Sequence, residues 1–239
     1  MKRLTFIGSS GLGAAGLALG TALAPATAAE AVPGGTNLVE RRANFDMATF
    51  DRILGRSAQY RMLWEAVAYV PTFLNNVKNS INGLTFGFGA DPSQVVTAVA
   101  GHGPSGSYAY TDYVWQKYRI GEYFGMKDAE GTTIAKNVFL AKRATSTSED
   151  PDDEHGSYQD TSVEALQSRG VTFLTCHTAV EEQSRGLVKR GFAPTGMSAS
   201  DVAADILTHL VPGALVVPSM VATIGVLQQR YRYAYLTIQ

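Results

Sequence analysis

The ten residues 171–180 have the sequence VTFLTCHTAV. Residues 171–176 form a short apolar run rich in β-branched side chains, which is typical of a strand buried on both faces of a sheet. Residues 178–188 then have the pattern of a helix. A buried strand that leads directly into a helix is the repeating unit of a parallel α/β sheet.

The rest of the chain repeats this alternation. Four further segments have the composition of strands, at residues 61–67, 95–100, 214–217 and 231–238. Helices are predicted between them, at residues 71–84, 112–123, 161–170 and 178–188, from Ser198 or Ser200 onward, and around 221–227. This order favours right-handed crossovers. We therefore expect an α/β fold with a mainly parallel sheet of about five strands, covered by helices on both faces.

The helix at 161–170 has local start and stop signals. Thr161 and Glu164 have the spacing of a capping box, and Gly170 is a typical residue after a helix end. Before it, residues 119–160 show little pattern, and the six acidic residues between 146 and 160 indicate an exposed loop. The acidic run at 150–155 lacks EF-hand spacing, so we interpret it as solvated and not as a cation site.

Composition excludes several classes of protein. The chain has 239 residues, 45% of them hydrophobic, and a formal net charge of −1, without the basic stripe of a nucleic-acid-binding protein. Its single cysteine excludes an internal disulfide and CxxC redox chemistry, and its four histidines show no zinc-ligand spacing. The sequence lacks a GxGxxG fingerprint, a P-loop lysine and a GxSxG elbow. We therefore expect no metal and no cofactor.

The first 29 residues have the organisation of an export signal. Lys2 and Arg3 precede an apolar, glycine-rich segment, and Ala26-Thr27-Ala28 fits a cleavage site, so cleavage is expected after Ala28 or Ala29. The signal is similar to a twin-arginine signal in which one arginine is lysine, and this leaves the export route open. An uncleaved membrane anchor is the alternative. No later apolar run is long enough to span a membrane. Residues 30–57 are interpreted as an arm or linker, and residues 58–239 as the domain.

Four chemically active residues fall at the predicted strand ends. They are Glu65, His102, Cys176 and His177. Ligands of parallel sheets bind outside the carboxyl ends of the strands, so we expect these side chains to lie along one edge as a catalytic group. Cys176 also precedes a helix, and the dipole of that helix favours a thiolate.

Each of these residues also has an ordinary structural interpretation. A lone cysteine at a strand end is often a small buried hydrophobe. His102 lies in a Gly/Pro turn and is equally well explained as a surface residue, whereas His177 can cap its helix or face solvent. Glu65 can pair with an arginine such as Arg61 or Arg185. The convergence of all four on one edge, and not any single residue, favours function.

Several segments resemble the C-terminal half of DsrE/DsrF-like proteins. These are 173–180, where a strand ends in Cys176, the strand–turn–helix at 210–222, and the aromatic segment 233–235; the helix at 74–84 and the strand at 95–103 also fit. The resemblance covers residues 58–239 and implies a flavodoxin-like three-layer sandwich. It also implies trimers or hexamers and sulfur chemistry in which Cys176 matches a persulfide-bearing cysteine. The export signal, the N-terminal arm and the insertion at 119–160 depart from typical members.

Two functions follow as hypotheses. The first is an exported, periplasmic sulfur carrier or sulfurtransferase-like protein that exchanges sulfur with a donor or acceptor protein. Cys176 would hold the persulfide, His102 and His177 would stabilise the thiolate or move protons, and Glu65 would orient a histidine. The second is a non-catalytic, oligomeric binding or assembly protein in which the cysteine is structural. A small-ligand sensor, or an enzyme with another substrate at the same edge, stays open as a third, and the sequence does not decide whether the protein is an enzyme.

Overall fold

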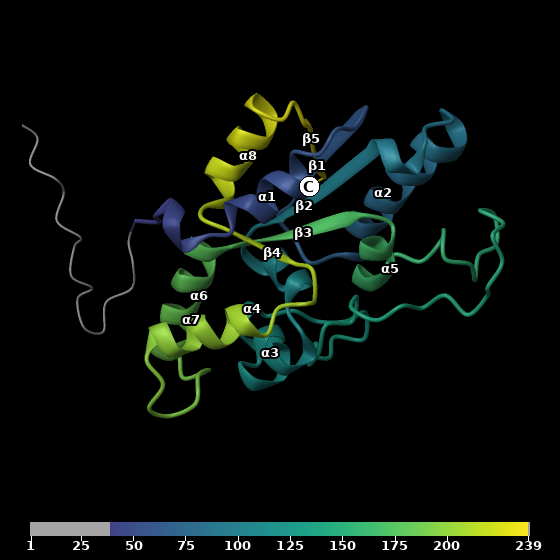
Figure 1. The fold of residues 1–239 in the computed structure, drawn as a ribbon. Coiled ribbons are helices and arrows are strands. Elements are labelled where there is room, and N and C mark those ends of the chain that lie inside the picture. The colour runs from purple at the N-terminus through teal and green to yellow at the C-terminus, as the bar shows by residue number, and fades with distance from the viewer. Residues whose placement is uncertain (1–38, 239) are drawn as a thin grey trace, which may run out of the picture. The chain divides into compact units, whose positions relative to one another are not determined.

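The computed structural model describes residues 39–238, and within them all the strands belong to one parallel sheet (Figure 1). The spatial order of its five strands is β4-β3-β2-β1-β5. The strands are β1 (Tyr60–Ala66), β2 (Val95–Gly101), β3 (Val171–Cys176), β4 (Leu215–Val217) and β5 (Ala234–Ile238). This confirms the predicted α/β, flavodoxin-like three-layer architecture, although flavodoxin itself has the strand order 2-1-3-4-5.

Helices cover both faces of the sheet (Figure 1). On one face lie α2 (Pro71–Asn82) and α5 (Val163–Ser168), and on the other α1 (Met47–Leu54) and α8 (Met220–Gln229). A separate cluster joins α3 (Asp112–Lys117), α4 (Ile120–Phe124), α6 (His177–Lys189) and α7 (Ala199–Thr208). Short helical turns are η1 (Arg42–Asn44), η2 (Gly83–Gly87), η3 (Pro92–Gln94) and η4 (Gly103–Ala109).

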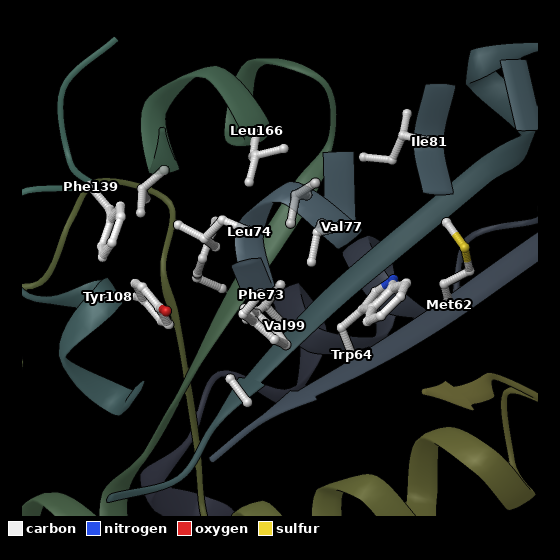
Figure 2. Close-up of a cluster of buried hydrophobic side chains, with 14 of the residues drawn as sticks. Met62, Trp64, Phe73, Leu74, Val77, Ile81, Val99, Tyr108, Phe139 and Leu166 are labelled. Atoms are coloured by element: carbon white, nitrogen blue, oxygen red, sulfur yellow. The ribbon is translucent and has the colours of Figure 1, made fainter. Parts of the chain in front are cut away.

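Helix α2 packs on the sheet through its apolar face. The apolar pattern of this segment predicts one helix face with Phe73, Leu74, Val77, Ile81 and Leu84. The first three are at most 1% exposed and Ile81 is 5% exposed, whereas Leu84 lies beyond the end of α2 and is partly buried. Figure 2 shows the first three against the sheet, with Trp64 of β1 meeting the edge of the Phe73 ring. Burial of such side chains, each contributing about 1.5–3 kcal/mol, fixes α2 on this face.

The position of α8 on the opposite face follows from a reversal in the direction of the chain. The steps β1 to β2, β2 to β3 and β3 to β4 all run the same way across the sheet, whereas β4 to β5 returns to the far side of β1. Right-handed connections therefore place α8 on the face opposite α2. Met220 and Leu227 of α8 pack there with Leu63 of β1 and Val217 of β4.

Part of the predicted arm is an integral helix. Residues 47–54, which were expected to be linker, form α1, and their Phe50 and Leu54 are buried under the sheet. Asp46 caps this helix by accepting a hydrogen bond from the Thr49 amide. The helix was missed because it is short and its apolar pattern spans only two turns. Residues 1–38, which include the export signal and its cleavage site, lie outside the described residues.

Two other local predictions need correction. The helix expected at 112–123 is broken between α3 and α4, where Arg119 has a left-handed backbone (φ 47°), and this turn buries Tyr118 and Ile120 completely. The helix expected to be capped by Thr161 is instead capped by Ser162, whose hydroxyl accepts from the Ala165 amide.

The insertion at 119–160 is largely irregular, as expected, but it is not merely an exposed loop. Phe139 enters the α2 face of the core (Figure 2), and Asn137 is 4% exposed. The amide nitrogen of Asn137 donates to the carbonyls of Tyr108 and Tyr110, both at 2.9 Å. These contacts fasten the insertion to the segment that follows β2.

Asp160 fastens the other end of the insertion. Its buried carboxylate accepts hydrogen bonds from the backbone amides of Arg143 (2.6 Å), Ala144 (2.9 Å) and Ser162 (2.8 Å). Burial alone would raise the pKa of Asp160, but these hydrogen bonds outweigh it and lower the pKa.

Among the helices of residues 39–238, none is long and apolar enough to cross a bilayer.

Replacing Asp160 should destabilise the fold in a pH-dependent way. Because the folded pKa lies below the ordinary value of 3.8, the carboxylate stabilises the fold above that value, and this contribution is lost as pH falls through the folded pKa. We expect Asp160→Asn to lower the free energy of unfolding by about 2–3 kcal/mol at pH 7. Urea unfolding should show the gap to wild type closing below pH 4. The exposed Asp152→Asn is the control, and an equal effect of both variants at pH 7 would contradict this account.

Candidate functional site

The strand order places a switch point between β3 and β4. Strand β3 leads into α6, within a run of connections that cross the sheet in one direction, and β4 leads into α8, which crosses back on the opposite face. In an open parallel sheet, a crevice forms where neighbouring strands send their connections to opposite faces, and ligands bind there. Cys176 ends β3 at this point, and Pro218 follows β4.

Cys176 is held between the N-termini of two helices. It is the N-cap of α6, and its Sγ accepts hydrogen bonds from the amides of Ala179 (3.4 Å) and Met220 (3.3 Å). Ala179 belongs to the first turn of α6, and Met220 is the first residue of α8. The partial positive charges of both helix ends therefore converge on the sulfur, where they stabilise negative charge.

The crevice itself is narrow. The hydroxyl and the amide of Thr178 both donate to the carbonyl of Pro218, at 2.9 and 3.3 Å, and tie the end of β3 to the end of β4. Cys176 is 9% exposed. The thiol is thus placed as the topology predicts, but it lies beneath the surface.

His177 is paired with a residue of the N-terminal segment. Its Nδ1 lies 2.6 Å from Oε1 of Glu40, and its ring meets the edge of Phe45. The side chains of His177 and Glu40 are 19% and 10% exposed, so this hydrogen-bonded pair is largely shielded from water. The segment 39–46 therefore lies against the residue next to Cys176.

Glu65 and His102 form a second carboxylate–histidine pair. The two atoms His102 Nε2 and Glu65 Oε1 are 2.9 Å apart, although Nε2 is buried without a well-directed hydrogen bond. The contact is therefore an ion pair when the ring is protonated. Tyr235 of β5 donates its hydroxyl proton to Glu65 Oε2. Glu65 thus pairs with His102 and Tyr235 and not with an arginine.

The sheet register brings this pair toward the cysteine. Ala100 pairs with Leu174 in the last register pair of β2 and β3, and His102 and Cys176 each follow their residue of that pair by two positions. Side chains alternate along a strand, and Leu63, Ala100 and Leu174 all pack on the α8 face. Glu65, His102 and Cys176 therefore belong to that same face.

Contrary to the prediction, the histidines do not hydrogen-bond to the sulfur. Within residues 39–238, both donors to Sγ are backbone amides, and neither His102 nor His177 hydrogen-bonds to it. The prediction that the histidines stabilise the thiolate directly therefore has no support in this geometry, and the backbone fills that role. The structure brings the four predicted residues to one edge, where Glu65 pairs with His102, Glu40 of the N-terminal segment pairs with His177, and Cys176 is capped by backbone amides.

Sequence reasoning missed Glu40 and Tyr235. Both are far from their partners in the sequence, at separations of 137 and 170 residues, so no local pattern could reveal which residues they contact. The acidic Glu40 next to two arginines gave only the signal of a surface arm. Tyr235 carried a detectable signal, because alternation in an aromatic edge strand puts it on the same face as a residue of the neighbouring strand.

Other features of the described residues do not add to this site. A cavity of about 990 Å³ lies between the loop after β1 and the insertion, with Tyr69 and Phe139 in its lining, and none of the four predicted residues borders it. No group of three or more His, Cys, Asp or Glu side chains in residues 39–238 is arranged to hold a metal ion.

Comparison with protein-family models, with curated proteins and with solved structures finds no match. The DsrE/DsrF resemblance accordingly stays a prediction.

Loss of the thiol should weaken two helix N-termini at once. We expect Cys176→Ala to lower the free energy of unfolding by about 1–3 kcal/mol, because two buried amides lose their acceptor. Cys176→Ser keeps an acceptor and should lose less. Chemical denaturation of the three proteins measures this difference, and an alanine variant as stable as wild type would contradict the capping role.

Removing the Glu40 carboxylate should expose the thiol. We expect Glu40→Gln to raise the rate of Cys176 alkylation by iodoacetamide about three- to tenfold, because the segment over His177 loses an ion pair that contributes about 1 kcal/mol. Glu122→Gln removes an exposed ion pair with Arg119 and serves as the control. Equal rates in wild type and Glu40→Gln would show that this segment does not limit access.

Proposed function

We propose that the protein is a sulfur carrier, or a sulfurtransferase-like protein, that holds sulfane sulfur as a persulfide on Cys176. The observation that supports this proposal is the pair of backbone amides, from Ala179 and Met220, that both donate to Sγ at the switch point of the sheet. Such donors stabilise an anionic sulfur without a metal or a cofactor. The proposal includes action after export, as the sequence of residues 1–29 predicts.

The transfer chemistry requires no oxidant. The Cys176 thiolate attacks the outer sulfur of a donor persulfide, R–S–S–H. A bond forms between Sγ and that sulfur while the donor S–S bond breaks, and R–S⁻ leaves with the electron pair. The product is Cys176–S–S–H. In the reverse sense, an acceptor thiolate attacks the outer sulfur and Cys176 leaves as the thiolate, which the two amides stabilise.

His102 has the position of a proton-transfer group in this proposal. Its side chain is 31% exposed, so it can exchange protons with water, and Glu65, which also accepts a hydrogen bond from Tyr235, orients it at the same edge of the sheet as the cysteine. His177 has a different task. Its ion pair with Glu40 holds the segment 39–46 against the site, so opening of that segment would admit a partner's sulfur.

A non-catalytic assembly function is the second candidate, and the burial of Cys176 favours it. A thiol that is 9% exposed and caps two helices has a structural role that needs no sulfur chemistry. The strand β5 is an edge strand whose residues 234–238 include no charge and no proline, so it leaves a pairing edge for another subunit. In this candidate, a trimer or hexamer forms equally well with Cys176→Ser.

The carrier proposal predicts a reducible mass. After incubation with polysulfide and removal of the reagent, intact mass should increase by one or two sulfur atoms, about 32 or 64 Da, and return to the starting value with reductant. Cys176→Ser is the control and should gain nothing. An unmodified wild-type thiol, together with an oligomer of unchanged size in Cys176→Ser by light scattering, would overturn the carrier proposal and support the assembly function.

A further inference from the structure

Two cationic side chains, the buried Lys78 and the partly exposed Arg169, lie near each other at the amino end of the sheet, far along the strands from Cys176. Lys78 of α2 is 7% exposed, and its Nζ donates to Oε1 of Gln159 at 2.7 Å. Arg169 follows α5, and its guanidinium donates to Oδ1 of Asn82 at 2.5 Å and to the Tyr158 carbonyl at 3.5 Å. All of these acceptors are neutral.

The charges of this pair are uncompensated. Within residues 39–238, no carboxylate forms an ion pair with Lys78 or Arg169. Burial and the nearby guanidinium lower the pKa of Lys78, and burial lowers the pKa of Arg169. Buried charges are normally paired, since leaving water costs several kcal/mol for each ion. The rule applies most strongly to Lys78, because Arg169 is partly exposed, and neither side chain has a carboxylate partner among these residues.

A small pocket adjoins the guanidinium. It has a volume of about 200 Å³, and its lining consists of Ile81, Thr85, Pro92, Val95, Tyr158 and Arg169. The Tyr158 ring is held between the Phe86 ring and the Arg169 guanidinium. The hydroxyl of Thr85 is buried and has no hydrogen-bond partner. The pocket is thus lined by a guanidinium, whose two terminal nitrogens also bond to Asn82 and Tyr158, and by an unused hydroxyl.

We propose that this pocket binds a small inorganic oxyanion, such as phosphate or sulfate. The Arg169 guanidinium and the Thr85 hydroxyl would donate hydrogen bonds to its oxygens. Lys78, which does not line the pocket, would add positive charge nearby. Guanidinium groups match tetrahedral oxyanions through paired N–H donors. The volume lies below that of pockets for drug-sized ligands, which favours a free ion over a nucleotide.

A bound anion would strengthen the attachment of the insertion. Tyr158 and Gln159 belong to the segment that Asp160 fastens, and both are held by the two cations. An anion in the pocket beside Arg169 would offset the positive charge of both side chains and stabilise these contacts. The opposing interpretation is that Lys78 and Arg169 are only clamps for the segment, with no ligand.

The test is thermal unfolding of the full chain in phosphate, in sulfate and in chloride at constant ionic strength, with calorimetric titration of phosphate. We expect a saturable rise in melting temperature with phosphate and sulfate and not with chloride, because a ligand that binds only the folded state stabilises it. Glycerol phosphate separates the possible sources, since a free-ion site should bind this ester at least tenfold more weakly than phosphate.

Two variants distinguish a ligand site from a clamp. Thr85→Val should weaken phosphate binding about tenfold through loss of one charged hydrogen bond, while its melting temperature in chloride stays equal or rises because a buried unpaired hydroxyl is removed. Arg169→Gln should abolish binding, and the exposed Arg190→Gln should not change it. Phosphate that fails to bind wild type saturably, or that binds Thr85→Val and wild type equally, would overturn the proposal.

Discussion

The two hydrogen bonds that converge on the Cys176 sulfur depend on the reversal of the chain after β4. Because β4 connects back to the far side of β1, α8 starts on the opposite face from the earlier connections, and its first amide, at Met220, meets the first turn of α6 across the end of β3. The Cys176 side chain lies at the end of β3 and accepts hydrogen bonds from the N-termini of both α6 and α8. Cysteine suits this position, because sulfur reaches both donors and tolerates burial.

The same edge shows how distant segments complete a site. Two carboxylate–histidine pairs flank the thiol, and each depends on a segment from another part of the chain: Glu40 comes from the N-terminal segment, and Tyr235 from the last strand. The sheet brings the strand ends that carry Glu65, His102 and Cys176 to one edge, and the segment 39–46 lies against His177, the residue next to the sulfur.

The strands, most of the helices and the shared edge were predictable from sequence, because the buried strands have continuous β-branched runs and the helices have clear apolar faces. What was missed depends on tertiary contacts. The break at Arg119 arises because Tyr118 and Ile120 both enter the core, and the shift of the cap to Ser162 arises because Asp160 takes up its amide. The strand order and the Glu40 contact join residues too distant for any local pattern to connect.

The central claim is that the amides of Ala179 and Met220 hold the sulfur that does the chemistry. Its most direct test is a ¹⁵N-resolved NMR spectrum of the wild-type protein before and after loading with sulfane sulfur. The account predicts that the amide signals of Ala179 and Met220 move together and return on reduction, while that of Gly170, at the other end of β3, stays in place. Loading that leaves both signals unmoved would contradict it.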